Sequence, residues 1–168
     1  MDYLQRIDTN TSGQRYDVTP LFTDYAAFAA AVADLATPFA DEAVDLVAGI
    51  DALGFILGTA VAMRLQKGFL AIRKGGKLPV KVNRVRFVDY TGQQKALEIR
   101  TDGLDPGANV LLVDEWVETG AQAKAAIKLV EMQNGRIAGI ATINMDNNKT
   151  TRQLRQQYRV FAVGDPKG

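Results

Sequence analysis

The stretch that most constrains the fold of this chain runs from 109 to 131. The apolar run Val110 to Val113 follows Pro106-Gly107, and such a short continuous run is typical of a strand buried on both faces of a parallel sheet. Farther along, apolar residues recur at helical spacing from Ala123 to Val130, and Asn134-Gly135 ends the pattern. The stretch is therefore predicted to form a strand, a loop and a helix with one buried side.

The predicted loop carries residue types that suit a sugar phosphate. Thr119-Gly120 falls where the helix begins, and a helix start offers N–H groups and the positive end of the helix dipole to a phosphate. Asp114 and Glu115 fall at the carboxyl end of the strand, which is the edge where open α/β sheets bind ligands. Because carboxylates accept hydrogen bonds from sugar hydroxyls, the loop predicts a site for ribose 5-phosphate. The alternative is an ordinary strand–loop–helix unit whose acids are solvated.

Composition narrows the class of protein. The 168 residues are expected to form one domain, 1–168, and the 20 lysines and arginines nearly balance the 19 acids, so nucleic acid is not an expected partner. The absence of cysteine and histidine excludes disulfides, thiolate catalysis and a Ser-His-Asp triad. No apolar run approaches the roughly 18 residues of a membrane span, and the N-terminus lacks the apolar core of a signal peptide. We therefore expect a cytoplasmic protein without a membrane partner.

Strands alternate with helices along the rest of the chain. A helix is expected from Thr23 or Asp24 to the residue before Pro38, with its buried stripe at Tyr25, Phe28, Val32 and Leu35. Further strands are expected at 44–48, 69–72, 137–143 and 159–163, a hairpin at 80–100, and helices at 55–66 and 150–157. This alternation predicts an α/β fold with a mainly parallel twisted sheet flanked by helices on both faces.

Several blocks of sequence resemble one enzyme family. The segment from Asp114 to Gln122 resembles the signature of the type I phosphoribosyltransferases, in which two acids follow an apolar strand and precede Thr-Gly and a helix. Three further blocks resemble the adenine phosphoribosyltransferases in the same order. Residues 17–20 resemble part of the hood over the base, 45–51 with 54–58 resemble the pyrophosphate loop, and 72–79 resemble the basic stretch.

The resemblance implies a fold and a reaction. The fold would be that of the type I phosphoribosyltransferases, with residues 1–22 forming an arm and a small N-terminal hood. The reaction would transfer ribose 5-phosphate from phosphoribosyl pyrophosphate to a purine, with adenine giving AMP and pyrophosphate in purine salvage. Mg²⁺ is the implied cofactor, held through substrate and water and not by direct side-chain ligation. The implied assembly is a homodimer.

The resemblance also assigns roles to individual residues. The ribose hydroxyls would be held by Asp114 and Glu115, and the 5-phosphate by the loop Glu118, Thr119, Gly120, Ala121 and Gln122. The pyrophosphate would be held by Asp51, Ala52, Leu53, Arg73, Lys74 and Lys77, with the cations belonging to the same subunit or to its partner. The hood residues would be Arg15, Tyr16 and Asp17. The catalytic candidates are Asp89, Tyr90 and Glu118.

Departures from the family pattern keep other functions open. Leu53 stands where the adenine enzymes usually have an arginine, and Ala121 and Gln122 replace their Gly-Thr. These changes favour an alternative in which the protein is a noncatalytic module that binds a nucleotide or phosphoribosyl pyrophosphate. Glu118 stands where the 6-oxopurine phosphoribosyltransferases have an acid near N7 of the base, so hypoxanthine or guanine is a second alternative as acceptor. Transfer to a non-purine base is a third.

Overall fold

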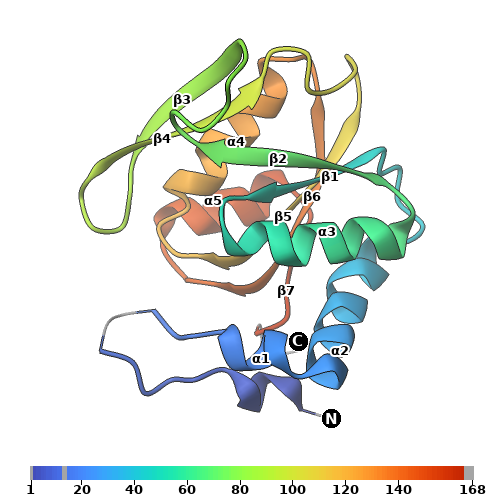
Figure 1. The fold of residues 1–168 in the computed structure, drawn as a ribbon, viewed down its shortest axis with the longest axis vertical. Helices are drawn as coiled ribbons and strands as arrows, with labels where there is room; N and C mark the ends of the chain where they lie inside the picture. Colours follow the sequence, from blue (N-terminus) through green and yellow to red (C-terminus); the bar gives the residue numbers. More distant parts are fainter. Residues whose placement is uncertain (1, 13–14, 165–168) are drawn as a thin grey trace.

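The structure of the chain is a computed structural model that describes residues 2–12 and 15–164 (Figure 1). Within these residues, seven strands form one sheet in the order β3-β4-β2-β1-β5-β6-β7. The strands are β1 (Leu46–Ile50), β2 (Gly68–Lys74), β3 (Val82–Val88), β4 (Gln94–Arg100), β5 (Asn109–Val117), β6 (Arg136–Met145) and β7 (Val160–Ala162). Strands β2, β1, β5, β6 and β7 are parallel to their neighbours in this group. Strand β4 pairs antiparallel with both β2 and β3. The predicted, mainly parallel sheet is confirmed.

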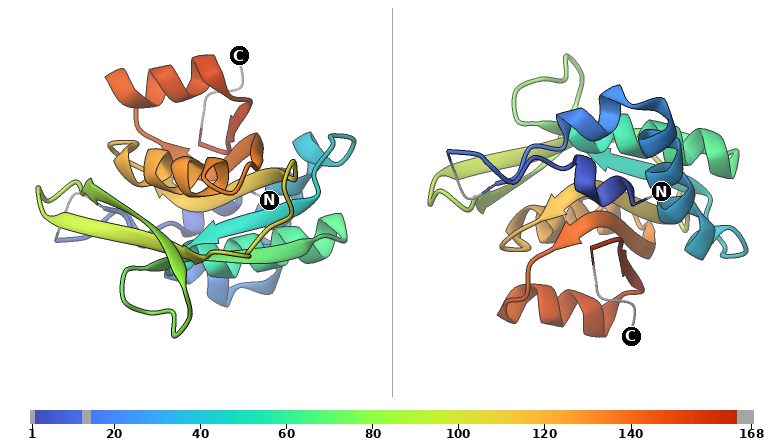
Figure 2. Two further views of the ribbon diagram at one scale, coloured as in Figure 1. Left: turned by 90° about the horizontal axis from the view of Figure 1, so that it is seen from above. Right: turned by 90° about the horizontal axis from the view of Figure 1, so that it is seen from below.

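Helices cover both faces of the sheet. They are α1 (Thr19–Thr23), α2 (Tyr25–Ala36), α3 (Leu53–Leu65), α4 (Ala121–Glu131) and α5 (Lys149–Gln157), with short 3-10 turns η1 (Tyr3–Arg6) and η2 (Thr37–Phe39). Figure 2 shows α2 and α3 on one face and α4 and α5 on the other. One apolar core lies between the sheet and α4, and a second lies between the sheet and α2 with α3. Among the described residues, no helix is both long and apolar enough to cross a membrane.

The first long helix differs from its prediction at one position. Asp24 is its N-cap and accepts a hydrogen bond from the Ala27 N–H at 3.0 Å, as predicted. Val32 and Leu35 are buried and Phe28 is half-buried, but Tyr25 is 86% exposed. Tyr25 was therefore wrongly predicted to face the core. The first residue after the cap points outward here, and the small side chain of Ala27 takes the buried place instead.

The central strand is longer than its apolar run. The predicted strand was Asn109 to Val113, followed by a loop from Asp114, but β5 continues to Val117. The reason is a partner strand, since Asp114 pairs with Thr142 and Val117 with Met145 of β6. The two acids therefore lie within the last part of β5, and the connecting loop is limited to 118–120.

The hairpin prediction is confirmed, and its neighbour is longer than expected. Strands β3 and β4 are joined by a turn at 89–93. The strand predicted at 69–72 continues to Lys74, because Arg73 pairs with Glu98 and Lys74 with Leu97 of β4. The first part of the predicted basic loop therefore belongs to the sheet.

Strands β1 and β5 mark the point where the direction of the connections reverses. The chain leaves β1 through α3 toward β2, and it leaves β5 through α4 toward β6, so the two helices lie on opposite faces. Ligands bind in such sheets at the carboxyl ends of the strands beside this reversal. The N-terminal arm and the tip of the β3–β4 hairpin extend on this same side of the molecule (Figures 1 and 2).

A glycine at the end of β1 permits the close turn into α3. A Cβ placed on Gly49 would lie 2.2 Å from the carbonyl oxygen of Gly54, and backbone cannot yield as a flexible side chain does. We predict that Gly49→Ala lowers the free energy of unfolding by about 2–3 kcal/mol in urea denaturation. Gly68→Ala is the control, because its Cβ would meet only the end of the Leu46 side chain at 3.0 Å. Equal effects of the two changes would contradict the conclusion that the close turn into α3 requires glycine at position 49.

Candidate active site

The two acids of β5 occupy a buried place at the carboxyl end of the sheet. Asp114 is 4% exposed and Glu115 9%. The Glu115 N–H donates to Asp114 Oδ1 at 3.0 Å, and Gln122 Nε2 donates to Asp114 Oδ2 at 3.2 Å. Burial, followed by the negative charge of Glu115, raises the pKa of Asp114 well above its ordinary value. The ionised form of Asp114 is thus disfavoured in the protein without ligand, as expected of a carboxylate whose hydrogen-bond donors or cation come with the substrate.

The loop from β5 to α4 has the geometry of an anion site. Gly120 adopts φ +80°, a left-handed conformation that glycine tolerates, and the Thr119 Oγ1 accepts a hydrogen bond from the Ala121 N–H at 3.2 Å. The Asn148 side chain, which caps α5, donates to the Glu118 carbonyl oxygen at 2.7 Å and fixes the loop from outside. The first N–H groups of α4 have no intrahelical acceptor and point into this turn.

A cavity of about 690 Å³ lies between this loop and the β3–β4 hairpin. Its lining residues are Arg15, Lys74, Gly75, Gly76, Arg84, Arg86, Phe87, Asp89, Tyr90, Gln94, Lys95, Ala96, Leu97, Glu118, Thr119 and Gln122. The structure therefore brings together predicted residues from the hood, the basic stretch, the hairpin turn and the phosphate loop. A small hollow that also borders Glu118 is lined by Asp114, Gly120 and Trp116, among others.

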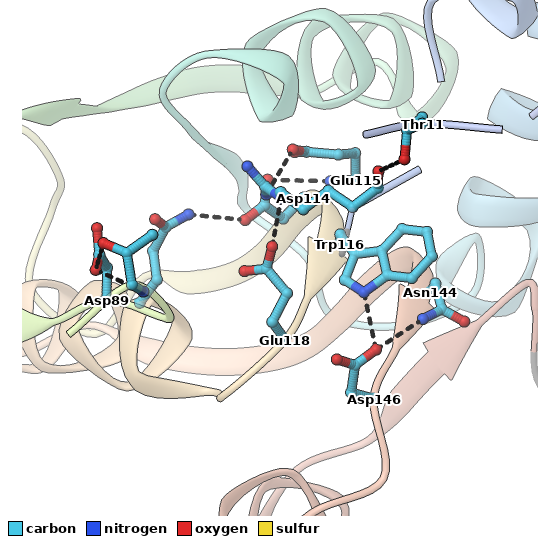
Figure 3. Close-up of polar contacts among 11 residues, drawn as sticks. Thr11, Asp89, Asp114, Glu115, Trp116, Glu118, Asn144 and Asp146 are labelled. Carbon is cyan, nitrogen blue, oxygen red and sulfur yellow. Dashed lines mark hydrogen bonds and ion pairs between the residues drawn. The ribbon is translucent and has the colours of Figure 1, made fainter. Parts of the chain in front are cut away.

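Arg15 joins three of these parts. Its guanidinium forms an ion pair with Glu118 and contacts Glu115 Oε1 at 3.3 Å, and it lies 5.3 Å from the centre of the Tyr90 ring. Figure 3 shows Glu118 pointing toward the Asp114–Glu115 pair. Burial raises the pKa of Glu118, and the charges of Glu115 and Asp146 raise it further, while Arg15 lowers it. The other predicted hood residue beside it, Tyr16, instead contacts Trp116 edge to face at 5.3 Å.

The predicted pyrophosphate residues are divided between the cavity and its surroundings. Lys74 lines the cavity, whereas Arg73 is paired with Asp51 at 3.5 Å and Lys77 lies exposed outside it. Ala52 is exposed, and Leu53 is the first residue of α3. Asp17 is not among the cavity residues either, and its carboxylate accepts hydrogen bonds from the N–H and the hydroxyl of Thr19, the first residue of α1. The structure thus places Lys74 alone of the predicted pyrophosphate residues on the cavity wall.

Asp89 holds the hairpin turn in the observed conformation. Its Oδ1 accepts hydrogen bonds from the Thr91 hydroxyl at 2.6 Å and from the N–H groups of Thr91 and Gln93. The hydroxyl bond lowers the pKa of Asp89 more than any other contact does. The side chain is therefore an ionised acceptor in this state. Tyr90, beside it, is 46% exposed at the mouth of the cavity.

The sequence prediction missed several residues of the site. Arg84, Arg86 and Lys95 bring three cations of the hairpin to the cavity. Trp116 donates its Nε1 hydrogen to Asp146 Oδ1 at 2.8 Å, and Asn144 donates to the same oxygen at 3.2 Å (Figure 3). The alternation of charged and apolar residues in β3 was a signal for the hairpin cations, since one face of that strand carries both arginines.

Glu98 fixes the basic loop to the sheet. It is fully buried in β4, and its Oε1 accepts from the N–H groups of Lys77 and Leu78 at 2.8 and 2.9 Å, while Arg84 donates to Oε2. Burial opposes the charge, but these donors, together with the Gly76 N–H, lower the pKa of Glu98 to about 2. The loop from Gly75 to Leu78 is thereby held against β4.

Known proteins share both the sequence and the fold. A family model described as "Phosphoribosyl transferase domain" matches residues 20–165. The adenine phosphoribosyltransferase of Jannaschia sp. (strain CCS1) is 44% identical over 128 residues, which are 76% of this chain and 70% of the relative. The crystal structure of the adenine phosphoribosyltransferase from Rhodothermus marinus aligns with a TM-score of 0.86 and 30% identity, over 96% of this chain and 94% of that one. The corresponding Giardia lamblia enzyme, complexed with 9-deazaadenine, aligns with a TM-score of 0.85 and 31% identity, with the same coverage.

These matches, and the fold and loop geometry, define the class of the protein as a type I phosphoribosyltransferase. The chain belongs to the phosphoribosyltransferase family and, within it, to the group of the adenine phosphoribosyltransferases. The resemblance predicted from the sequence is confirmed.

The low pKa of Glu98 makes a pH prediction. A folded-state pKa of about 2, below the ordinary value of 4.5, means that ionised Glu98 stabilises the fold above pH 4.5 and that this contribution is lost as pH falls toward 2. We expect Glu98→Gln to lower the urea midpoint at neutral pH and the difference from the wild type to shrink with acid. Asp102→Asn, which removes an exposed ion pair with Arg100, is the control and should change little. A pH-independent difference would contradict this role.

Proposed function

We propose that this protein transfers ribose 5-phosphate from phosphoribosyl pyrophosphate to adenine, forming AMP and pyrophosphate in purine salvage. The observation that carries the proposal is the arrangement of β5 and α4 at the reversal point of the sheet. There, Thr119 and Gln122 of the loop line the cavity, and the helix starts after a left-handed glycine. The two buried acids do not line the cavity themselves, but Gln122 connects it to Asp114 through a hydrogen bond. The named relatives are adenine phosphoribosyltransferases, which supports adenine as the acceptor.

The sugar phosphate would bind across the β5–α4 loop. Asp114 and Glu115 would accept hydrogen bonds from the ribose hydroxyls, and the N–H groups of residues 119–122 would surround the 5-phosphate. The side chain of Gln122 donates to Asp114, so this residue would tie the ribose acids to the phosphate loop. Holding the sugar at both ends supplies orientation, which lowers the entropic part of the barrier.

The pyrophosphate would occupy the cationic part of the cavity. Lys74, Arg86 and Lys95 line it from β2, β3 and β4, and fixed cations stabilise the charge that develops on a leaving group. They would supply the positive charge that an arginine at the position of Leu53 would otherwise give. Gly54 lies close to Asp114, since a Cβ placed on Gly54 would lie 3.0 Å from Asp114 Oδ1, and the first turn of α3 therefore lies at the same edge.

Mg²⁺ is part of the proposal. Within residues 2–12 and 15–164, no cluster of three or more acids could hold a metal by itself. The donor set fits Mg²⁺ that is bound mainly by substrate oxygens and water, with Asp114 and Glu115 near its coordination shell, as is usual for this ion. When bound, the ion would neutralise charge on the pyrophosphate as it leaves.

The base would lie at the mouth of the cavity, under the hood. Asp89, Tyr90 and Glu118 border this space, and we assign proton handling at the base to them. The raised pKa of Glu118 means that its carboxyl group takes up a proton more readily than an exposed one does, which keeps a 6-oxopurine as the second candidate acceptor. Arg15 and Tyr16 would form the hood over the base.

We also propose that the protein works as a homodimer in the cytoplasm. Helix α3 exposes Ile56 and Met63, which are 43% and 74% exposed, and dimerisation is one way to cover such a face. Lys77 lies outside the cavity of its own chain, so a partner's site is the place where it would meet pyrophosphate. Sedimentation analysis of the purified protein tests this part of the proposal.

The experiment that tests the function measures pyrophosphate release from phosphoribosyl pyrophosphate and Mg²⁺. The acceptors are adenine, hypoxanthine, guanine, xanthine, uracil and orotate, each added alone. We expect release with adenine, whereas release with hypoxanthine or guanine alone would move the assignment to the 6-oxopurine enzymes. Silence with every base, from protein shown to be folded by circular dichroism, would favour the noncatalytic module.

The ribose acids give a mutational prediction. In Asp114→Asn/Glu115→Gln, the loss of charged acceptors for two sugar hydroxyls should reduce turnover by about 10²-fold or more. The melting temperature should change little, because Asn and Gln keep the size of the two acids and an acceptor oxygen for the Glu115 N–H. Asp45→Asn is the control, since Asp45 caps the opposite end of β5 through the Asn109 N–H. Normal turnover in the double variant would rule out the assigned role.

A further inference from the structure

Glu118 poses an electrostatic problem for the proposed phosphate site. Its side chain lines the cavity, it directly precedes Thr119 of the phosphate loop, and only 20% of it is exposed. Two more acids act on it, Glu115 and Asp146. A carboxylate about 6 Å from a phosphate, at an effective dielectric near 20, would weaken binding by roughly a hundredfold.

Arg15 is the cation that faces Glu118. Its guanidinium pairs with Glu118 and reaches Glu115 Oε1 at 3.3 Å, so one positive charge serves two of the three acids. Two other arginines near the site are paired with acids of their own, Arg73 with Asp51 and Arg84 with Glu98. Arg15 comes from the N-terminal hood, a hundred positions before Glu115, and its place depends on the tertiary fold.

We propose that Arg15 is a positioning residue whose guanidinium neutralises Glu118 and thereby lets the phosphate loop accept an anionic sugar phosphate. This inference rests on the proposed function and goes beyond it, because it makes the hood a determinant of phosphate affinity. The guanidinium also lies over the Tyr90 ring, 5.3 Å from its centre, and this contact helps to hold it in place. The hood, the hairpin turn and the phosphate loop would thus be joined through one side chain.

The proposal differs in its consequences from direct binding of phosphate by Arg15. If Arg15 acts through Glu118, its removal matters only while the carboxylate is present. If Arg15 bound the phosphate itself, its loss would weaken binding whether or not the carboxylate of Glu118 is present. The two cases are separated by a double-mutant cycle, in which residues that act on each other give non-additive effects.

The test measures the dissociation constant of phosphoribosyl pyrophosphate with Mg²⁺ by isothermal titration, without a base. We expect Arg15→Ala to weaken binding by about tenfold or more, and Arg15→Lys to recover much of the loss because it keeps the charge. In Arg15→Ala/Glu118→Gln, affinity should return to within about threefold of Glu118→Gln alone. Arg6→Ala is the control, since it breaks another hood ion pair, with Asp24, and Arg6 does not line the cavity.

Each outcome has one meaning. Equal weakening by Arg15→Ala in the wild-type protein and in the Glu118→Gln variant would overturn the proposal in favour of direct phosphate binding. Unchanged affinity in Arg15→Ala would overturn it as well, while the proposed phosphoribosyl pyrophosphate site would stand because the wild type binds. A folded wild type that fails to bind phosphoribosyl pyrophosphate would instead remove the proposed function and this inference together. Melting curves for all variants show whether a loss of affinity is a loss of fold.

Discussion

The pairing of β5 with both of its neighbours is the constraint on which the rest of the structure depends. Residues Val110 to Val113 are fully buried between the two apolar cores, and β1 and β6 are hydrogen-bonded on either side. Apolar burial of this extent supplies the main driving force for such a sheet. Because β5 stays paired with β6 as far as Val117, the backbone fixes Asp114 and Glu115 in a buried place. Without that pairing, the two acids could turn toward solvent.

Charge balance then determines the character of the site. Four acids near the cavity have a donor from another segment: Glu98 has the basic loop, Asp51 has Arg73, Asp114 has Gln122, and Glu118 has Arg15. The cations that line the cavity from the hairpin give it the opposite sign from the β5 edge. A substrate with a sugar at one end and a polyphosphate at the other matches that division.

Local patterns predicted what local interactions determine. The apolar run of β5, the helical spacing of α4 and the alternating hairpin were predictable, because burial and periodicity are visible in consecutive residues. The extension of β5 to Val117 was not, since it depends on pairing with β6. The cation Arg86 was missed because a charged residue on an edge strand is usually solvated, and no short window contains both Arg15 and Glu118.

One hydrogen bond that fixes the phosphate loop comes from a residue made later in synthesis than the loop itself. The Glu118 carbonyl accepts from Asn148, thirty positions later, and Asn148 also caps α5. A nascent chain that has emerged only as far as α4 therefore lacks the donor that holds this loop. The anion site would reach its final shape only after β6 has added to the sheet and α5 has docked, so its geometry depends on a segment that is made after the site's own residues.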